Sequence, residues 1–582
     1  MSDPFDNVTP LRPPGDEPPA APPPGAGPEE PAGPEKDCAA EPLNDVGNGK
    51  RLAAHFGADL IWVPRVGWHV WDRRRWARDP DEIELRRRAQ RLGPLIEKEI
   101  PHLRPAPREK ALIDEERGLM ARRAALIGEA GEAARAELGR VDARLAMLDR
   151  ELGGWKKRVA RHATFAKDAG NSGRIRNAMG EASVHLSRAV EEMDAAPLEV
   201  CCENGVLRFG VTPGEDGATD VADVRLLRHA RDQLITKMMA VAYDPDARAP
   251  RFEAFLARVQ PDPEMRGFLQ RWFGLSMTGL TGEQKLCFFH GGGANGKSVM
   301  TDLMARILGD YSATAKVESL TGRNRRGGGD ATPDLVPLIG ARMVRAAEPD
   351  EMERLQEGTI KELTGGEPIL IRALHSDFVE VRPVAKITIS GNHKPQVRGT
   401  DDGIWRRLLL VPWDVQIPKT ERDPALLSKL LDEGPGILNW MVEGLLDYLE
   451  GGLREPQAVL DATEEYRADS DPVGGFLAAC CVVTGRPEDF ILTRDLVDAF
   501  NFWREDSGES QWTPATISRR LKDKSGRWRD AEGRTFEAKK RSSQGYVGLV
   551  LQDLFKEKFD KAPRDHRGRV IWPRGTEQEG ET

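Results

Sequence analysis

The chain has 582 residues, of which 39% are hydrophobic and 31% charged, and its formal net charge is −9. This length allows about two to four domains with large buried cores. No stretch approaches about twenty uninterrupted apolar residues and the N-terminus is acidic and Pro-rich, which argues against a membrane span and a secretory signal. The acidic balance argues against a protein that coats nucleic acid non-specifically, although a local basic patch would suffice for DNA binding.

The six cysteines include two adjacent pairs, and no two are spaced C-x-x-C. Adjacent cysteines are poorly placed for a zinc site or a routine disulfide. We therefore expect buried thiols in a reducing compartment, the cytoplasm.

The amino-acid composition of the first part of the chain changes near Asn44. Residues 1–43 are rich in Pro, Gly, Ala and Glu and cannot bury enough apolar surface to fold, so we expect a disordered tail. An N-terminal module is expected over residues 44–250. It should begin with a short helix over Gly47–Phe56 and a pair of strands over Asp59–Val63 and Gly67–Asp72.

Four tryptophans beside arginines stand in and after this strand pair. They are Trp62, Trp68, Trp71 and Trp76. They could form a platform on which bases stack. The alternative is a small aromatic core with a charged edge in solvent, and we favour this alternative.

A highly charged helical region follows, from residue 80 to about 195. Leu145, Leu148 and Leu152 continue an apolar stripe at helical spacing, which predicts a long helical hairpin or short coiled coil near 105–190. The sequence gives it no function beyond packing against a partner helix. A turn and strand then follow at Asn204–Phe209, and a helical connector leads to Trp272.

An apolar strand over Lys285–Phe289 runs into a glycine-rich loop and an apolar helix start. The loop matches G-x-x-x-x-G-K-[ST], the phosphate-binding pattern. Its backbone N–H groups and the helix N-terminus would bind phosphates, Lys297 would reach the β- and γ-phosphates, and Ser298 would ligate Mg²⁺. The alternative is a glycine-rich turn that matches by chance. The pattern consists of Gly291, Gly292, Gly293, Ala294, Asn295, Gly296, Lys297 and Ser298.

Two polar residues downstream fit the same chemistry. Residues 341–348 predict a strand that ends in Glu348, which would complete the magnesium site and polarise the attacking water. Asp350 and Glu351 lie just beyond, and an acidic surface turn would look similar. A further strand over Val384–Ser390 leads to Asn392, which could hold the attacking water against the γ-phosphate.

A hairpin and an arginine pair complete this region. Residues 369–381 predict a hairpin with Leu374–Asp377 at its tip. Arg406 and Arg407 precede a strand over Leu408–Pro412, and an arginine presented to a neighbouring subunit would stabilise transition-state charge there. The alternative is an arginine pair on a solvated strand edge.

The order of these motifs resembles superfamily 3 helicases, in particular the phage/plasmid primase–helicase group, whose helicase module is shared with poxvirus primase–helicases. The resemblance rests on five features: the G-G-G-A-N-G-K-S loop, the single acid, the K-x-L-T-G-G segment with its hairpin, the Asn after a strand, and the W-R-R segment. The resemblance covers roughly residues 44–550, except the helical stretch near 105–190.

The resemblance implies an α/β, AAA+-like P-loop NTPase core that assembles as a ring, commonly a homo-hexamer, around single-stranded or forked DNA. ATP and Mg²⁺ would lie between subunits, held by one subunit's P-loop, Glu348 and Asn392 and by an arginine of the next. Arg407 is the preferred arginine because it directly precedes the strand, and Arg406 is the second choice. Arg372 and His375 of the hairpin would face the central pore and contact DNA.

Two departures from the family pattern matter. The chain has Gly365-Gly366-Glu367 where the family usually has an Asp after the glycines, so the hairpin may begin differently. No catalytic primase domain is recognisable before residue 44, so priming is not expected of this chain and a separate primase could be a partner.

Residues 421–470 are expected to be helical and to close an ATPase domain of residues 251–470. A winged-helix-like DNA-binding domain is predicted over 472–556, with helices over Leu492–Trp503 and Pro514–Leu521, a wing strand near Gly545–Val550, and a polar tail over 557–582. Arg519, Arg520 and Lys522 would contact DNA. The alternative is a charged helix end in solvent.

The sequence therefore predicts an ATP-dependent replicative DNA helicase of a phage, plasmid or prophage. One alternative is an AAA+ ATPase that remodels proteins, but those usually expose an aromatic-hydrophobic pore loop, whereas residues 374–377 are mostly polar. The other is a DNA-binding scaffold with a vestigial nucleotide site.

Overall fold

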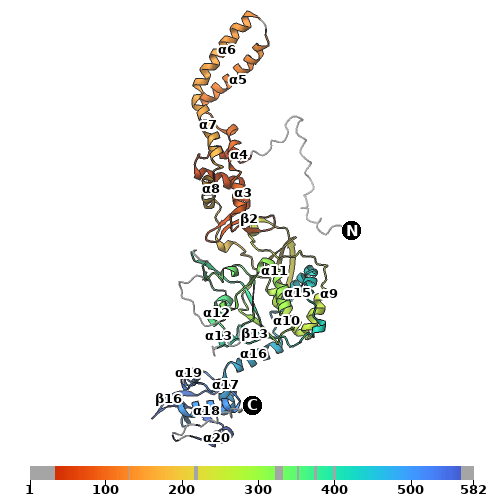
Figure 1. The fold of residues 1–582 in the computed structure, drawn as a ribbon, viewed down its shortest axis with the longest axis vertical. Coiled ribbons are helices and arrows are strands. Elements are labelled where there is room, and N and C mark those ends of the chain that lie inside the picture. Colours follow the sequence, from red (N-terminus) through yellow and green to blue (C-terminus); the bar gives the residue numbers. More distant parts are fainter. Residues whose placement is uncertain are drawn as a thin grey trace, which may run out of the picture. The chain divides into compact units, whose positions relative to one another are not determined.

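The computed structural model describes residues 33–129, 131–214, 220–321, 332–349, 353–372, 377–397 and 402–564, with residues 566 and 570 (Figure 1). It divides the chain into two compact units, Met1–Trp71 with Arg78–Ala189, and Asp72–Ala77 with Val190–Thr582. In the described part of the chain, no helix is both long enough and apolar enough to cross a membrane.

The first unit is mainly helical. Its helix α2 begins at Asp45 because the side-chain oxygen of Asn44 accepts a hydrogen bond from the N–H of Gly47 at 2.9 Å. Leu52 of α2 packs with Leu85, Leu92 and Ala178 in a common core. The elements assigned to this unit are α1 (Glu35–Cys38), α2 (Asp45–Phe56), β1 (Leu60–Val63), β2 (Gly67–Trp71), α3 (Ile83–Ala89), α4 (Leu92–Glu97), α5 (Pro107–Ile127), α6 (Glu132–Glu151), α7 (Gly153–Asp168) and α8 (Ser172–His185).

The folded part of this unit begins before residue 44. Arg51 is fully buried and forms a bidentate ion pair with Glu99, at 2.7 and 3.0 Å, and it also donates to the carbonyl oxygen of Cys38 at 3.0 Å. A buried guanidinium needs these acceptors, and they hold the segment around α1 in place. The predicted disorder is therefore wrong for residues 35–43, and residues 1–32 lie outside the described residues.

The strand pair is confirmed, with β1 and β2 antiparallel. Trp68 and Trp71 in β2 are 3% and 8% exposed, and Trp76 in β3 (Trp76–Arg78) is 3% exposed. The ring of the half-buried Trp62 lies 5.2 Å from that of Trp68. Bases could not reach the faces of buried rings, so the aromatic core is confirmed and the stacking platform is wrong.

The predicted helical hairpin is also confirmed, as α5 and α6 (Figure 1). Its two helices bury few apolar side chains, Leu126, Val141 and Leu148. Exposed ion pairs join the helices instead, including Arg122 with Glu137 at 2.8 Å and Arg144 with Glu115 at 2.7 Å. Such exposed pairs stabilise weakly, so this hairpin contributes little to the core of its unit.

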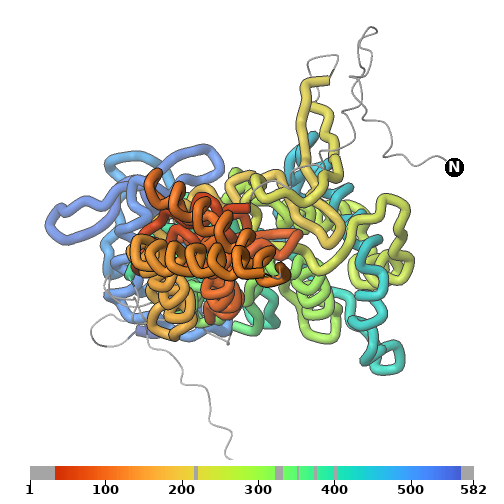
Figure 2. The backbone as a smooth tube through the Cα atoms, turned by 90° about the horizontal axis from the view of Figure 1, so that it is seen from above, coloured from red at the N-terminus to blue at the C-terminus, as the bar shows by residue number. Residues whose placement is uncertain are grey.

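The second unit begins with an antiparallel sheet, β4 (Glu199–Cys202), β5 (Gly205–Pro213) and β6 (Asp220–Leu227), whose long β5–β6 hairpin is yellow in Figure 2. Val200 and Phe209 of this sheet lie in one core with Phe252, Trp272 and Phe289. The predicted domain boundary at residue 250 is therefore wrong. The sheet shares its core with residues of the predicted ATPase domain, 251–470, and the division falls between residues 189 and 190.

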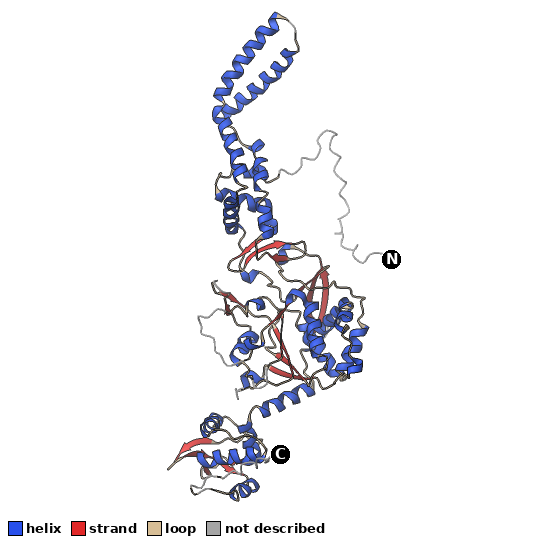
Figure 3. Ribbon diagram, in the orientation of Figure 1, coloured by secondary structure: helices blue, strands red, loops and turns tan. Residues whose placement is uncertain are grey.

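A five-stranded parallel sheet in the order β13-β7-β12-β9-β8 forms the centre of this unit (Figure 3). Its strands are β7 (Leu286–His290), β8 (Ser312–Thr314), β9 (Met343–Ala347), β12 (Lys386–Gly391) and β13 (Leu408–Pro412). Successive residues point to opposite faces: Cys287 and Phe289 enter one core, and Leu286 and Phe288 enter another. Both faces are covered, as is typical of parallel sheets.

Helices and a small hairpin complete this domain. The predicted hairpin is confirmed in its strands, with β10 (Ile369–Ile371) paired to β11 (Val379–Val381), whereas residues 373–376 of its tip lie outside the described residues. The helices are α9 (Pro250–Val259), α10 (Pro263–Leu275), α11 (Lys297–Leu308), α12 (Glu357–Gly365), α13 (Asp402–Trp405), α14 (Leu426–Leu431), α15 (Gly434–Gly451) and α16 (Gln457–Asp469).

The last part of the chain has its own core, which includes Phe476, Phe500 and Phe536. Two helices, α18 and α19, are followed by the antiparallel pair β16–β17. Phe559 in α20 is 4% exposed, so residues 557–560 belong to the fold rather than to a frayed tail. The elements are α17 (Pro472–Cys480), β14 (Cys481–Val483), β15 (Phe490–Leu492), α18 (Thr493–Asp506), α19 (Pro514–Lys524), β16 (Glu537–Lys540), β17 (Gln544–Val547), β18 (Leu549–Leu551) and α20 (Asp553–Asp560).

Candidate functional site

The glycine-rich loop lies between β7 and the N-terminus of α11, in the strand–loop–helix arrangement that the sequence predicted. Gly291 has no room for a side chain, because an added Cβ would stand 2.2 Å from the carbonyl oxygen of Trp413. Gly296 has φ +86°, a conformation that only glycine adopts readily, and ends the loop directly before α11. The loop is thus fixed at both ends.

Asn295 holds the middle of the loop against the end of β13. Its side-chain nitrogen donates a hydrogen bond to the carbonyl oxygen of Trp413 at 2.9 Å, and the residue is 4% exposed. Gly292, Ala294 and Ser298 are exposed. The loop therefore presents backbone and a hydroxyl group to solvent at a helix N-terminus, where an anion binds well.

Three of the predicted site residues meet at the carboxyl edge of the sheet. In the parallel register Gly391 lies opposite His290, and Ser390 lies opposite Ala347. The residues that follow these strands therefore emerge side by side. They are Gly291, Glu348 and Asn392.

Hydrogen bonds connect these side chains. The Lys297 ammonium group donates to the carbonyl oxygen of Gly291 at 2.7 Å and to the side-chain oxygen of Asn392 at 3.2 Å. Asn392 in turn donates to Glu348 at 3.5 Å. We call Lys297, Asn392 and Glu348 the polar row. Asn392 and Glu348 are exposed, so the row is open to solvent on one side.

The electrostatics of the row follow from the burial of Lys297, which is 3% exposed. Burial lowers the pKa of the Lys297 ammonium group, whereas the carboxylate of Glu348 acts to raise that pKa. A buried cation beside a helix N-terminus makes the pocket of the loop electropositive, which suits a polyphosphate.

Glu348 has an unusual backbone. Its φ is +53°, in the left-handed region that a glutamate rarely adopts, and its N–H donates to the carbonyl oxygen of Ser390 at 2.8 Å. Backbone strain of this kind is found at functional sites, because the surrounding structure has to maintain it. The turn aims the carboxylate away from β9 and toward Asn392.

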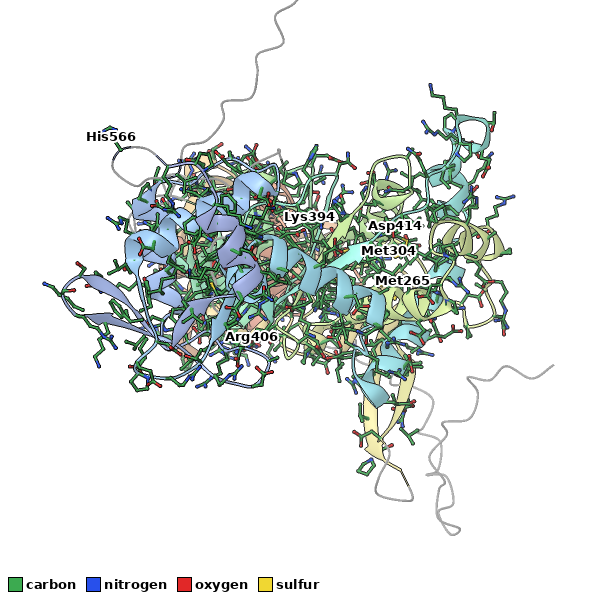
Figure 4. All side chains as sticks on the ribbon, turned by 90° about the horizontal axis from the view of Figure 1, so that it is seen from below. Met265, Met304, Lys394, Arg406, Asp414 and His566 are labelled. Carbon is green, nitrogen blue, oxygen red and sulfur yellow. The ribbon has the colours of Figure 1, made fainter. Side chains whose placement is uncertain are left out.

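Sequence reasoning missed several charged residues around the row. His290 ends β7, and its pKa is lowered first by burial and then by the positive charges of Lys394 and Lys297. Lys394 follows β12 and Asp414 follows β13 (Figure 4). Their signal is their position just beyond apolar strands, but this position becomes informative only once the strand order is known.

A magnesium ion would need more ligands than the described side chains supply. Within the residues that the structure describes, no group of three or more His, Cys, Asp or Glu side chains is arranged to hold a metal. Ser298 and Glu348 fit Mg²⁺ chemically, since this ion prefers oxygen ligands and usually keeps several waters besides substrate phosphates. These two residues would therefore hold Mg²⁺ only together with a nucleotide.

The exposure of the two arginines reverses the order of preference that the sequence suggested. Arg407 is 8% exposed and donates to the carbonyl oxygen of Gly403 at 2.7 Å and to the side chain of Gln284 at 3.1 Å, so it is used within its own chain. Arg406 is exposed. Both precede β13, at the edge of the sheet opposite the glycine-rich loop. A five-residue strand spans about 16 Å, so neither arginine approaches the row of its own subunit.

The predicted DNA contacts are only partly surface residues. Arg372 stacks over the ring of Phe378, 4.7 Å from its centroid, and His375 lies outside the described residues. Arg520 stacks on Trp512 at 5.0 Å, and burial lowers its pKa, so it faces inward. Arg519 and Lys522 are exposed.

Comparison with known proteins gives two family matches. Residues 49–261 match the family described as D5 N terminal like, and residues 289–407 match a family of unknown function (DUF5906). A candidate helicase of Acanthamoeba polyphaga mimivirus is 27% identical over 319 residues, 52% of this chain and 32% of the relative. These matches make the chain similar to primase–helicases of the D5 type.

Other proteins similar to this chain also come from viruses. A candidate helicase of frog virus 3 is 30% identical over 165 residues, 28% of this chain and 17% of the relative. A candidate primase of African swine fever virus is 22% identical over 335 residues, 54% of this chain and 34% of the relative. The chain thus spans about a third or less of the length of these relatives.

Among solved structures, the apo C-terminal region of NrS-1 matches with a TM-score of 0.34 and 11% identity. The match covers 59% of this chain and 96% of that structure. Because this likeness is so low, the site is interpreted from the residues of this chain.

Proposed function

We propose that the chain is an ATP-dependent superfamily 3 DNA helicase that acts in replication, in a phage, plasmid or prophage, and translocates along DNA as a homo-hexameric ring. The observation that carries the proposal is the polar row beside the glycine-rich loop at a helix N-terminus. The names of the relatives support a role in replication. We assign no priming activity to this chain, so a separate primase is its expected partner.

Each residue of the row then has a role in ATP hydrolysis. Lys297 binds the β- and γ-phosphates, and it exchanges its bond to the carbonyl oxygen of Gly291 for a phosphate oxygen. Ser298 and Glu348 would hold Mg²⁺, which would neutralise charge on the phosphates. Asn392 stands between Lys297 and Glu348 and orients the attacking water, and Glu348 polarises it.

Among the residues that the structure describes, no arginine bonds to Lys297, Asn392 or Glu348, so an arginine that stabilises the developing charge has to come from elsewhere. Arg406 is the residue that can supply it to a neighbouring subunit, since it is exposed and lies at the opposite edge of the sheet. An arginine supplied in this way contributes about 10³–10⁵ in rate in related reactions. Arg407, the first choice from sequence, instead supports the start of β13 from within.

DNA contacts are proposed at two places. The β10–β11 hairpin, with Arg372 at its base and His375 in its tip, would follow the DNA backbone in the pore. The helix pair α18–α19 with the β16–β17 hairpin would act as a winged helix, in which Arg519 and Lys522 on α19 contact phosphates.

The test is ATP hydrolysis with and without single-stranded DNA, for wild type, Lys297→Ala and Arg406→Ala. We expect DNA to stimulate wild type, each variant to lose at least about a hundredfold in rate, and a mixture of the two to regain activity. The activity returns at those interfaces where the Arg406→Ala chain supplies an intact Lys297 and the Lys297→Ala chain supplies an intact Arg406. Arg306→Ala, an exposed arginine on α11, is the matched control and should hydrolyse ATP normally.

Two outcomes would reject the proposal. If wild type hydrolyses ATP but does not respond to DNA, the motor acts on another substrate, such as a protein. If wild type does not hydrolyse ATP under any condition, the chain is a DNA-binding scaffold.

A further inference from the structure

Tyr466 on α16 contacts both segments that the proposed reaction needs. Its hydroxyl group donates a hydrogen bond to the carbonyl oxygen of Pro395, three residues after Asn392. The edge of its ring meets the face of Trp405 or the reverse, with centroids 5.3 Å apart and planes at 85°. Trp405 directly precedes Arg406. One side chain thus joins the loop after β12 to the turn before β13.

These contacts lie in a packed interior. Tyr466 is 3% exposed and Trp405 is 7% exposed, and both belong to the core cluster that also contains Val397 and Ile404. A buried aromatic pair with a fixed hydroxyl group has little freedom to move independently, because protein interiors are close-packed. A shift of the loop after β12 therefore has to displace Tyr466 or break its hydrogen bond.

The helix that carries Tyr466 is fixed to the sheet one turn earlier. The hydroxyl group of Thr463 accepts a hydrogen bond from the N–H of Leu410 in β13 at 2.9 Å and donates to the carbonyl oxygen of Val459 at 2.6 Å. Thr463 and Tyr466 are three residues apart and so share one face of α16. The helix covers the edge strand β13 and holds Tyr466 at a set position relative to that strand.

A charged side chain reinforces the link on the side of the polar row. The Lys394 ammonium group lies 5.5 Å from the centroid of the Tyr466 ring and 3.8 Å from the carboxylate of Asp469, at the end of α16. Lys394 is two residues from Asn392, and its charge also acts on His290. The segment that carries Asn392 is therefore attached to α16 by a hydrogen bond, a cation–π contact and an ion pair.

We propose that Tyr466 is a positioning residue that couples the two ends of each subunit's sheet. Through it, the state of the loop that carries Asn392 would set the position of the arginine that the same subunit presents to its neighbour. This proposal rests on the proposed function, because it needs ATP sites shared between subunits. It adds that hydrolysis is cooperative around the ring and that the cooperativity depends on Tyr466.

The test is the ATP dependence of hydrolysis by the full-length chain with Tyr466→Phe. This change keeps the ring against Trp405 and removes the hydroxyl group. We expect wild type to show a Hill coefficient above unity, and Tyr466→Phe to show a Hill coefficient near unity with a maximal rate lower by about three- to tenfold. The affinity for a non-hydrolysable ATP analogue should not change, because the glycine-rich loop is untouched.

Mixed rings separate coupling from a local effect on Asn392. In a mixture of Arg406→Ala and Lys297→Ala chains, the working sites use the row of the first and the arginine of the second. Adding Tyr466→Phe to the Lys297→Ala chain, which supplies only the arginine, should lower the recovered rate. If Tyr466 only supports its own row or only fills the core, this addition leaves the recovered rate unchanged, and the proposal is wrong.

Control variants guard against a general loss of structure. Tyr448→Phe removes another half-buried hydroxyl group, which donates to Glu283 at 3.1 Å, and should leave the Hill coefficient as in wild type. Trp405→Phe approaches the same contact from its other side and should reproduce the loss of cooperativity. If wild-type rings share sites but Tyr466→Phe and Trp405→Phe remain as cooperative as wild type, the coupling is rejected and the proposed function stands.

Discussion

At the scale of single residues, the site depends on positions where backbone geometry leaves no choice of side chain. Gly291 packs directly against the carbonyl oxygen of Trp413, and the Asn295 side chain binds the same oxygen. Gly291 was evident in the sequence, because the G-x-x-x-x-G-K-[ST] pattern begins with a glycine there, whereas Asn295 stands at a position where the pattern accepts any residue. The sequence did not show that both residues pack against the end of β13, because Trp413 is more than a hundred residues away.

Gly291→Ala tests this packing. The added Cβ has to displace backbone, so we expect the free energy of unfolding to fall by about 1–3 kcal/mol and the affinity for ATP to fall with it. Thermal unfolding and nucleotide titration would measure both. Gly292→Ala is the matched control, because no atom lies within 4 Å of its added Cβ, and its melting temperature should equal that of wild type. Equal melting temperatures for both variants would contradict the argument.

Burial decided which arginines remain available to contact a neighbouring subunit or DNA. The sequence did not predict this burial residue by residue. Arg407 and Arg520 were both assigned to surfaces, yet one bonds to Gln284 and the other stacks on Trp512. Their neighbours Arg406 and Arg519 are exposed. Adjacent arginines in a sequence look alike, and only the packing of distant segments distinguishes them.

At the scale of elements, the chain combines a sheet that is packed on both faces with a helical hairpin that buries few side chains. Strands β7, β12 and β13 of the central sheet are nearly fully buried, and helices cover both faces. In α5 and α6, by contrast, exposed ion pairs do most of the joining. Helical spacing in the sequence predicted this hairpin well, because a helix of that length is a local property.

Replacing residues 107–151 by a short flexible linker should therefore leave the rest of the chain folded. The ion pair between Glu109 and Arg158 brings the start of α5 next to α7, so a short linker can close the gap. We expect unchanged ATP hydrolysis per subunit and a melting temperature within a few degrees of wild type. The comparison is made by calorimetry and a steady-state rate. A large loss in either would show that the hairpin has a structural role beyond its ion pairs.

At the scale of the whole molecule, the proposed function implies that the ATP site would be complete only in an assembly of subunits. No described arginine bonds to Lys297, Asn392 or Glu348 at one edge of the sheet, and the exposed Arg406 lies at the other edge. A ring places the two edges of neighbouring subunits together. This geometry accounts for an exposed arginine that has no use within its own subunit.

Dilution tests this requirement without a mutation. The rate of ATP hydrolysis per subunit should fall when the protein is diluted into the range where rings dissociate, because isolated subunits lack the second half of each site. Light scattering at the same concentrations would report the assembly. Arg406→Ala is the control, since its residual rate should not depend on concentration. A constant rate for wild-type chains that are shown to be monomeric would contradict a shared site.

The sequence by itself determined the features that arise from neighbouring residues. These are the strand–loop–helix around Lys297, the β10–β11 strands, the α5–α6 hairpin and the general α/β class, all of which follow from local backbone preference and hydrophobic periodicity. The positions of Glu348 and Asn392 directly after apolar strands were also predicted, because such strands are visible in the sequence.

Tertiary structure alone decided the rest. It placed Glu348 and Asn392 beside Lys297, because strand order brings together residues that are far apart in the chain. It moved the division between the units to residue 189, because β4 and β5 share a core with α10. It buried Arg407 and left Arg406 exposed. Burial and long-range contact are properties of the packed chain, and no window of sequence contains them.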